Sequence, residues 1–516
     1  MRLVVLVLCA LVVALVDVAR ASDETFVEEV LVERLNDGVA ALVFSFTSDA
    51  PANSTHLSKT SKPVASLMRV SRAETLDLWF GRGRWNARRY GAPTVTTKPS
   101  GAEVVGTWDA ADADAGWRDA TTMLGGIFCA SLGGLRASTA TTTPALMFRP
   151  WDGSSTATKR VDREMVTKYA HLPREAVCVE NLAPWLKQLP CRERGGFARA
   201  LRSAHDVFGA EHLTFGVRAR VVGDRLSIEQ TLMMALPSAS TAFANAKDAL
   251  SRAEDARCVA TDRSLLHVRD GDSLKTYEMG VDEFPESMDG ETSFRAPTLF
   301  VERFFTGTGN EAGGVVLDLE RANWGGGEFN GRAPVRVRLF QTFPWFVKMY
   351  LHTLAVEIDG RAVSRDTLDG VRFVPAVDRA RSSELEVQMM LPANASTIRL
   401  QFEYDKGFIR AQEFPPDGNR GFDLPPARVD AFVVGVDSSA TPTITNARRS
   451  PFLDRLRAAA AAPTAMYTQG LLLLLPTPDF SMTFNVAGMT GTAVSVLFMT
   501  TISRLVSREA WRGYAR

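Results

Sequence analysis

Histidines and cysteines are the residues of this chain whose side chains could carry nucleophilic or metal chemistry. The sequence contains six histidines and five cysteines. No two histidines follow the His-Glu-x-x-His pattern of zinc proteases, and no Gly-x-Ser-x-Gly elbow is present. A dyad such as Cys178 with His205 stays open, because its members would meet in space rather than in sequence. The residues therefore predict no catalytic centre, no metal site and no cofactor in this chain.

Four of the cysteines lie beyond the N-terminal segment, at Cys129, Cys178, Cys191 and Cys258. Their spacings match neither a Cys-x-x-Cys redox pair nor a zinc knuckle. In an oxidising compartment such cysteines form disulfides. Two internal bridges are open to them, or fewer if one cysteine pairs with another chain, and the spacing does not choose between these arrangements.

Three other motifs have some of the letters of a binding site. Residues 307–312 match the dinucleotide fingerprint, but strand-like residues follow where a phosphate-binding helix is needed, so a hairpin turn is the better interpretation. Residues 112–116 resemble the start of a calcium loop, but the glycine at loop position 6 and the glutamate at loop position 12 are missing. Trp85, Arg88 and Tyr90 could bind an anion or a sugar, although packing of their loop on its own lobe is favoured.

The composition excludes several classes of protein. Lysine plus arginine and aspartate plus glutamate each number 59, so the formal net charge is zero and gives no electrostatic basis for binding nucleic acid. Hydrophobic residues make up 46% of the chain, which argues against disorder. Between its two apolar ends the chain has about 450 residues, enough for two domains.

The two apolar ends predict a type I membrane protein. Residues 1–21 combine a basic start, an apolar run and the small-x-small site Ala19-Arg20-Ala21, which is typical of a cleaved secretory signal peptide. No charged residue occurs from 480 to 503, and a helix of that length would reach about 36 Å, enough for a bilayer core of about 30 Å. Arg504 and Arg508 follow, so we expect a transmembrane helix over 483–503 and a cytoplasmic tail over 504–516.

The elements that must position these residues are mostly short strands. Runs such as 39–46, 75–80 and 335–340 are apolar or alternating and are bounded by turn residues. The predicted fold class is mainly β with some α, with two β-rich, sandwich-like lumenal lobes and one C-terminal transmembrane helix. The Ala/Ser-rich stretch 238–260 is the expected linker between lobes 22–237 and 261–470, and a juxtamembrane motif covers 471–482. Asn53 and Asn394 begin glycosylation sequons on the lumenal side.

Several blocks of sequence, taken in order, resemble one family. The blocks are residues 85–93, 99–103, 126–132, 172–175, 177–182, 184–185, 189–191, 344–345, 350–354, 375–379, 391–394, 476–482 and 485–486. Between a signal peptide and an anchor, this series is similar to the phosphatidylinositol glycan class T family, a subunit of the GPI transamidase. The resemblance covers nearly the whole mature chain. It is most specific over 127–132 and 476–482 and weakest over 238–300.

The resemblance implies a non-catalytic subunit of an endoplasmic-reticulum membrane complex. That complex removes the C-terminal signal of a proprotein and joins the new carboxyl end to a GPI lipid. In the family, a separate caspase-like catalytic subunit is disulfide-linked to the class T subunit, and other membrane subunits complete the complex. The linking cysteine of the family falls in the block matched by 177–182, which implies this role for Cys178. Cys129, Cys191 and Cys258 are then the candidates for internal disulfides.

The juxtamembrane motif adds a hypothesis about substrate. Pro476 and Pro478 would keep the chain from running helically into the bilayer. They would hold Asp479, Ser481 and Asn485 near the membrane surface as candidate contacts with GPI or a partner chain. The equal alternative is a stiff linker with Asn485 as a helix cap. For the whole chain, the alternative function is a stand-alone type I lectin-like or receptor ectodomain.

Overall fold

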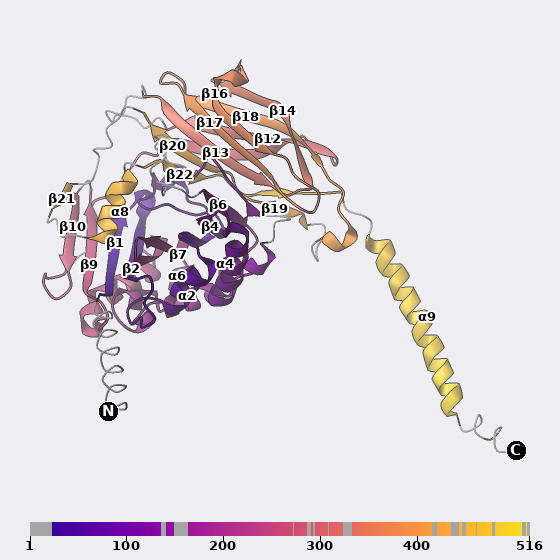
Figure 1. The fold of residues 1–516 in the computed structure, drawn as a ribbon, viewed down its shortest axis with the longest axis horizontal. Coiled ribbons are helices and arrows are strands. Elements are labelled where there is room, and N and C mark those ends of the chain that lie inside the picture. Colours follow the sequence, from indigo (N-terminus) through magenta and orange to yellow (C-terminus); the bar gives the residue numbers. More distant parts are fainter. Residues whose placement is uncertain are drawn as a thin grey trace, which may run out of the picture.

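The computed structural model describes most of the chain, and structural statements refer to those residues. They are 23–135, 141–148, 164–271, 273–285, 290–292, 295–307, 309–322, 333–414, 420–434, 443–445, 450–460, 462–476, 480–507 and 512. The predicted signal peptide, residues 1–21, lies outside them. Two β-rich lobes form the body, and one helix projects from it (Figure 1).

The first lobe is built on one 11-stranded sheet with the order β21-β10-β9-β1-β2-β8-β7-β3-β4-β6-β5. Its strands are β1 (Thr25–Arg34), β2 (Val39–Pro51), β3 (Thr75–Arg82), β4 (Gly101–Asp109), β5 (Thr141–Thr142), β6 (Met165–Leu172), β7 (His212–Val222), β8 (Arg225–Pro237), β9 (Arg263–Asp270), β10 (Ser273–Glu278) and β21 (Thr443–Thr445). Neighbouring strands are antiparallel except at β1–β9 and β10–β21, which are parallel.

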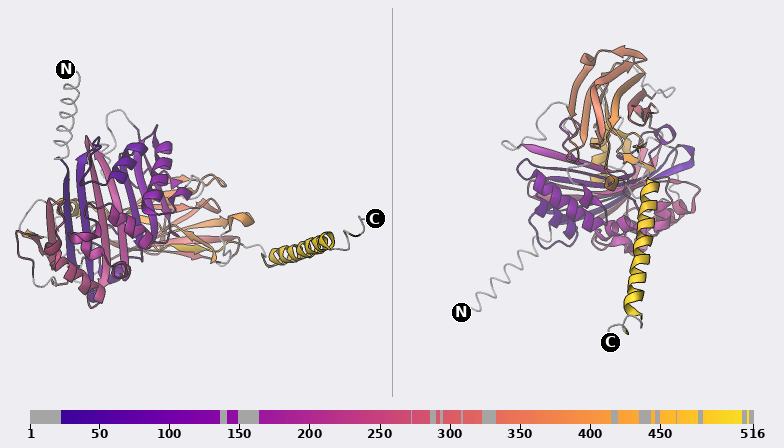
Figure 2. Two further views of the ribbon diagram at one scale, coloured as in Figure 1. Left: turned by 90° about the horizontal axis from the view of Figure 1, so that it is seen from below. Right: turned by 90° about the vertical axis from the view of Figure 1, so that its right-hand side faces the viewer.

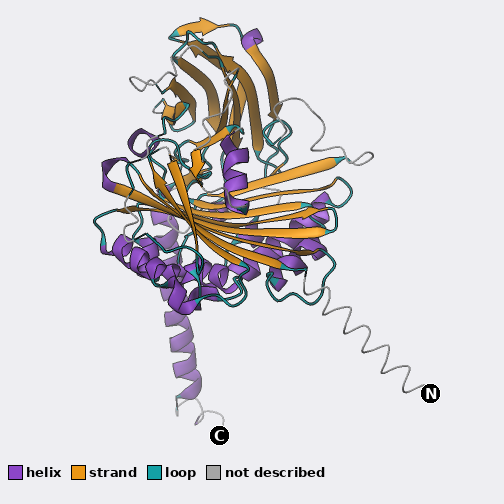
Figure 3. Ribbon diagram, turned by 90° about the vertical axis from the view of Figure 1, so that its left-hand side faces the viewer, coloured by secondary structure: helices purple, strands orange, loops and turns teal. Residues whose placement is uncertain are grey.

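Alternation along these strands produces one apolar face. Val30 lies opposite Phe44, Phe44 opposite Leu232, and Leu232 opposite Phe215, so a row of buried side chains crosses four strands. Successive residues of a strand point to opposite faces, and this register therefore places the whole row on one side. The helices that cover it are α2 (Lys62–Ser71), α4 (Ala113–Phe128), α5 (Val179–Lys187), α6 (Ala204–Phe208) and α7 (Thr241–Ser251), which form a layer along the sheet (Figure 3).

Trp108 is the residue of the sheet on which α2 and α4 are positioned. Trp108 of β4 is fully buried, and its indole Nε1 donates to the carbonyl of Ser71 at the end of α2, at 2.9 Å. Gly116 of α4 packs directly on the Trp108 ring, because a Cβ built at Gly116 would lie 2.3 Å from the indole nitrogen. The absence of a side chain at this position is what allows α4 to approach the sheet.

The second lobe pairs two five-stranded sheets face to face. One has the order β11-β12-β18-β14-β15 and the other β16-β17-β13-β20-β22. Their strands are β11 (Leu299–Thr306), β12 (Ala312–Arg321), β13 (Val335–Phe343), β14 (Val347–Ile358), β15 (Arg361–Val363), β16 (Leu368–Val374), β17 (Ser383–Leu391), β18 (Thr397–Lys406), β20 (Arg428–Val433) and β22 (Thr464–Tyr467). Leu317 and Phe402 of one sheet share a core with Val337 and Val387 of the other, which is the packing of a β-sandwich.

The C-terminal helix is separate from both lobes. At the end of the second lobe, β19 (Phe422–Leu424) pairs with β23 (Leu471–Leu473), and α9 (Phe480–Val506) then projects away from the body (Figures 1 and 2). Within α9, Asn485–Val506 is long and apolar enough to cross a membrane, and none of it is buried. The predicted fold class, mainly β with a C-terminal apolar helix, is confirmed.

The path of the chain between the lobes is not a single passage. After the range 238–260 predicted as a linker, β9 and β10 join the first sheet. The chain then builds most of the second lobe, returns to the first with β21 and α8 (Pro451–Ala460), and completes the second with β22 and β23. Phe452 and Leu453 of α8 pack with Leu31 and Val43 on the sheet face opposite the helix layer. The predicted limits of the two lobes, 22–237 and 261–470, stay a prediction.

Candidate functional site at the junction of the two lobes

The loop between β3 and β4, which includes α3 (Ala87–Tyr90), packs on its own lobe through its aromatic residues. Trp85 and Tyr90 are buried, with ring centroids 5.2 Å apart. The Trp85 indole donates to the Gly91 carbonyl at 2.8 Å, and the Tyr90 hydroxyl donates to the Glu211 carboxylate. The favoured interpretation of this loop, packing on its own lobe, is confirmed for these two side chains, and Trp85 also lines the cavity described below.

The arginines of the same loop reach across to the second lobe. Arg88 donates to the Glu320 carboxylate at 2.6 Å, and its guanidinium lies 4.1 Å from the centroid of the Phe300 ring. Arg84 donates to the Val301 carbonyl on the edge strand β11 at 2.8 Å. The charge of Arg88, which could have bound an anion, is therefore balanced within the chain by a carboxylate of the other lobe.

A cavity of about 620 Å³ lies at this junction. Its walls are the loop 84–100, the edge strands β11 and β22, and the segment that leads into β23. Charged Arg84, Lys98, Glu302 and Asp423 are set among proline and aliphatic side chains. A volume of this size holds a small ligand or a few residues of an extended chain. At the other end of β11, the hairpin interpretation of residues 307–312 is confirmed, since β11 and β12 pair in antiparallel register up to Thr306 opposite Gly314.

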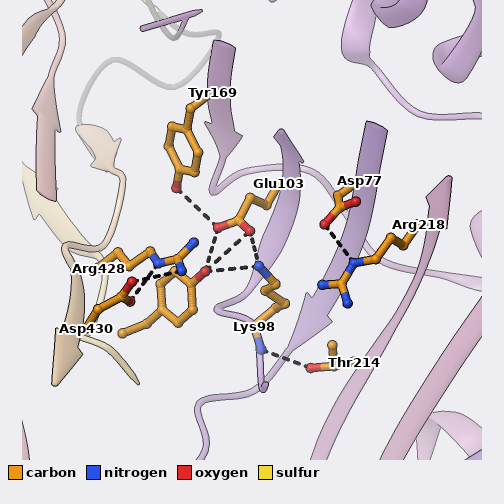
Figure 4. Close-up of polar contacts among 9 residues, drawn as sticks. Asp77, Lys98, Glu103, Tyr169, Thr214, Arg218, Arg428 and Asp430 are labelled. Carbon is orange, nitrogen blue, oxygen red and sulfur yellow. Dashed lines mark hydrogen bonds and ion pairs between the residues drawn. The ribbon is translucent and has the colours of Figure 1, made fainter. Parts of the chain in front are cut away.

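A buried cluster of charges, of which Lys98 and Tyr467 also line this cavity, joins the lobes (Figure 4). The Lys98 ammonium pairs with the Glu103 carboxylate, with side chains 7% and 1% exposed. The Tyr467 hydroxyl donates to Glu103 Oε2 at 3.0 Å and accepts from Lys98 Nζ at 3.0 Å. Tyr169 donates to the same carboxylate at 3.2 Å. Because Tyr467 comes from β22 and the other three from the first lobe, the cluster connects the two.

The electrostatics of the cluster favour the ionised form of the Glu103 carboxylate. Burial alone would raise the pKa of Glu103, but the positive charges of Lys98 and Arg428 outweigh it, so the pKa lies below its ordinary value. Burial lowers the pKa of Lys98, against the attraction of Glu103. Arg428 in turn forks onto Asp430 at 2.9 and 3.1 Å. A buried ion pair whose hydrogen bonds are all made fixes the relative positions of the elements that carry it. Here the pair and its hydrogen bonds fix the position of one lobe relative to the other.

A second contact between lobes uses a carboxylate as an acceptor for backbone groups. Glu386 of β17 accepts hydrogen bonds from the amides of Ala145, Leu146 and Met147, at 2.9, 2.6 and 2.8 Å. Arg372 on the neighbouring strand also donates to it, at 2.7 Å. The lobes are thus joined at several independent points, which favours a body of fixed shape.

Of the four cysteines, two form a disulfide and two are free thiols. Cys191 and Cys258 form a disulfide that closes a separation of 67 residues. Cys129 and Cys178 are free. Cys178 begins α5, and its Sγ lies 3.8 Å from the Asn181 side-chain oxygen.

Asn181 also ties the two free cysteines to one place. Its side-chain amide donates to the carbonyls of Phe128 and Cys129, at 3.1 and 3.2 Å, while its oxygen accepts from the Cys178 amide at 3.0 Å. The end of α4 and the start of α5 therefore meet at one point of the helix layer. His205 lies in α6, and Asn181, not a histidine, is the polar neighbour of the Cys178 thiol. Among the residues that the structure describes, no cluster of three or more metal-ligating side chains occurs.

The remaining predicted site residues are spread over the body and the C-terminal helix. Asn53 and Asn394 are both exposed in turns. Asp479 lies outside the described residues, Ser481 lies in the first turn of α9, and Asn485 is exposed further along the helix. The buried Lys98–Glu103 pair was not singled out from the sequence. The sequence signal for this pair is a carboxylate inside an otherwise apolar strand, within the block 99–103 that resembles the family.

The fold defines a class of protein: a β-rich body of two lobes carrying one helix that fits a membrane protein. The sequence model of the family described as "Gpi16 subunit, GPI transamidase component" matches residues 7–267 and 229–512. The chain belongs to this family.

Curated relatives extend over nearly the whole chain. The GPI-anchor transamidase component PIGT of Mus musculus is 29% identical, over 91% of this chain and 88% of its own length. The GPI transamidase component PIG-T homolog of Schizosaccharomyces pombe is 26% identical, over 93% and 89%. The GPI transamidase component GPI16 of Saccharomyces cerevisiae is 25% identical, over 88% and 82%. The protein is therefore a GPI transamidase component with a role in GPI anchoring. Among solved structures, the major pilin SpaA of Corynebacterium diphtheriae aligns over 40% of this chain and 46% of the pilin chain, at 11% identity. The TM-score of this alignment is 0.20, which is too low to indicate a shared fold.

Proposed function

We propose that this chain is a non-catalytic subunit of the transamidase in the endoplasmic-reticulum membrane. It holds a caspase-like catalytic chain through a disulfide and helps to position proprotein and GPI, in contact with the other membrane subunits. Membership of the Gpi16 family and a body whose lobes are joined by buried charges support this role. The alternative, a stand-alone lectin-like or receptor ectodomain, lacks such support.

The observation that carries the proposal is the free thiol of Cys178 at the start of α5. Cys178 and Cys129 are the free thiols among the described residues, whereas Cys191 and Cys258 are bonded to each other. Cys178 lies in the block 177–182, for which the family resemblance implies the linking cysteine. Of the two free thiols, Cys178 is thus the one that we assign to a bond with another chain.

Non-reducing electrophoresis of the native complex tests this assignment. We expect a covalent band containing a second chain, lost in Cys178→Ser and kept in the matched control Cys129→Ser. GPI attachment should fall in Cys178→Ser membranes because the catalytic chain is held less firmly. Persistence of the band in Cys178→Ser, or its loss in both variants, would contradict the assignment.

The topology and the juxtamembrane contacts are separate parts of the proposal. Glycosylation at the exposed Asn53 and Asn394, read as a mobility shift on endoglycosidase treatment and its loss in Asn→Gln variants, would place both lobes in the lumen. For the membrane surface, we propose that Asp479, Ser481 and Asn485 contact GPI or a partner. Asp479→Ala with Asn485→Ala should lower GPI attachment while the complex still co-purifies, and unchanged attachment would rule out this contact.

A further inference from the structure

An exposed apolar patch lies at the end of the second lobe from which the chain runs to α9. On β23 and just after it, Leu473 and Leu475 point into the sandwich core, whereas Leu472 and Leu474 point outward and are 47% and 58% exposed. Phe408, in the loop after β18, is 76% exposed. Large apolar side chains that gather on a surface mark a contact with something apolar.

Three contacts place the backbone next to Phe408 at the end of the lobe that carries β23. The amide of Gly407 donates to the Phe346 carbonyl at 2.6 Å. The Phe346 ring lies 4.9 Å from the ring of Phe422, centroid to centroid. Phe422 of β19 is the register partner of Leu473 on β23. Residue 408 therefore belongs to the same end of the lobe as β23, and Figure 1 shows β19 at the end that faces α9.

The length of the connecting chain sets how far this patch is from the helix. Only residues 475–479 separate Leu474 from Phe480, the first residue of α9, and a chain of that length reaches at most about 20 Å. Exposed Arg410 and Arg420 flank the patch. Aromatic and aliphatic side chains next to arginines are the composition of surfaces that rest in the interfacial zone of a bilayer.

We propose that Phe408, Leu472 and Leu474 form a membrane-contact patch that rests on the headgroup region of the bilayer crossed by α9. The inference rests on the proposed membrane anchoring by α9 and goes beyond it. With the helix alone, the body would swing on the short connecting segment. With the patch as a second point of attachment, the lobe stands at one inclination to the membrane, and the cavity at the lobe junction keeps a constant height above the lipid.

Fluorescence quenching by lipids tests the patch. Single cysteines labelled with the environment-sensitive dye NBD are placed at position 408, 472 or 474 of the full chain. The background carries Cys129→Ser and Cys178→Ser and keeps the internal disulfide. The protein is reconstituted in phosphatidylcholine nanodiscs with or without a nitroxide near the lipid headgroup. Two exposed positions are controls: Met499 on α9 and Val371 on β16, which lies away from α9 in Figure 1.

The expected result is at least a twofold loss of emission at positions 408, 472 and 474 with nitroxide lipid, quenching at 499, and no change at 371. Quenching at 499 without quenching at the three patch positions would overturn the patch and leave the anchor standing. No quenching at 499 would overturn the anchor and the patch together. A blue-shifted emission at 408 that nitroxide lipid does not quench would identify a protein contact instead. Equal quenching at 371 would mean adsorption of the whole body, which also refutes a local patch.

Discussion

Removing the buried carboxylate at the lobe junction is the most direct test of how the two lobes are joined. Glu103→Leu leaves the Lys98 ammonium, 7% exposed, without its counter-charge and leaves the Tyr467 hydroxyl without its acceptor. Breaking a buried ion pair in this way costs about 3–5 kcal/mol, because the remaining charge stays desolvated. At roughly 1 °C per kcal/mol for a cooperative unit of about 490 residues, we expect the unfolding midpoint of the full chain in detergent to fall by about 3–5 °C.

Two controls separate this effect from a general loss of stability. Asp318→Leu removes an ion pair with Arg399 that is half-exposed, and should cost at most about 1 kcal/mol. The double variant Lys98→Met with Glu103→Leu removes both charges and should recover most of the loss. Limited proteolysis should cut Glu103→Leu between the lobes faster than the double variant. The reasoning is refuted if Glu103→Leu and Asp318→Leu shift the midpoint equally, or if the losses measured for Lys98→Met alone and Glu103→Leu alone simply add in the double variant.

Three further variants test other parts of the first lobe. Burial raises the pKa of Glu28 to about 7 from 4.5, so the folded state binds this proton more tightly than the unfolded chain does. The contribution of the protonated carboxyl to the free energy of unfolding is therefore full below about pH 4.5 and falls as the pH rises toward 7. Urea unfolding should show that Glu28→Gln removes about 3 kcal/mol of this fall. Cys191→Ser opens a loop of 67 residues and should lower the unfolding free energy by about 4 kcal/mol, while reductant should then have no further effect on the urea midpoint. Gly116→Ala forces a methyl group into the Trp108 ring and should lower the thermal midpoint by several degrees, whereas Gly126→Ala on the same helix meets nothing within 4 Å and should be neutral or stabilising.

Each of these variants has an outcome that contradicts its premise. A flat stability difference between wild type and Glu28→Gln across pH 4.5–7.5 would mean that the carboxyl is not held protonated. An unchanged midpoint in Cys191→Ser would mean that the disulfide does not constrain the unfolded chain. Equal effects of alanine at 116 and 126 would mean that α4 does not pack through its glycine.

The fold class and the C-terminal helix could be predicted because both depend on local patterns. The alternation of apolar and polar residues within a strand, and a long run without charges, can each be recognised from consecutive residues of the sequence. The contact of Tyr467 with Glu103 joins residues 364 apart in sequence, and nothing near either residue points to the other. The disulfide shows the same limit: spacing left the pairing open, and only the fold brings the Cα atoms of Cys191 and Cys258 to 5.6 Å. The parallel neighbour of β1 was likewise set by a distant crossover.

The return of α8 to the first sheet has a consequence for synthesis. Glu29 of β1 is buried, and its carboxylate accepts from the Phe452 amide at 2.9 Å and from the Ser450 hydroxyl. As the chain emerges from the ribosome, this acid therefore lacks both partners from the α8 region until more than four hundred later residues have been made, and its earlier partner is His267 of β9, 3.3 Å from Oε1. The first sheet completes this buried contact only when α8 has been made, and nascent chains stalled before residue 450 should remain substrates for chaperones.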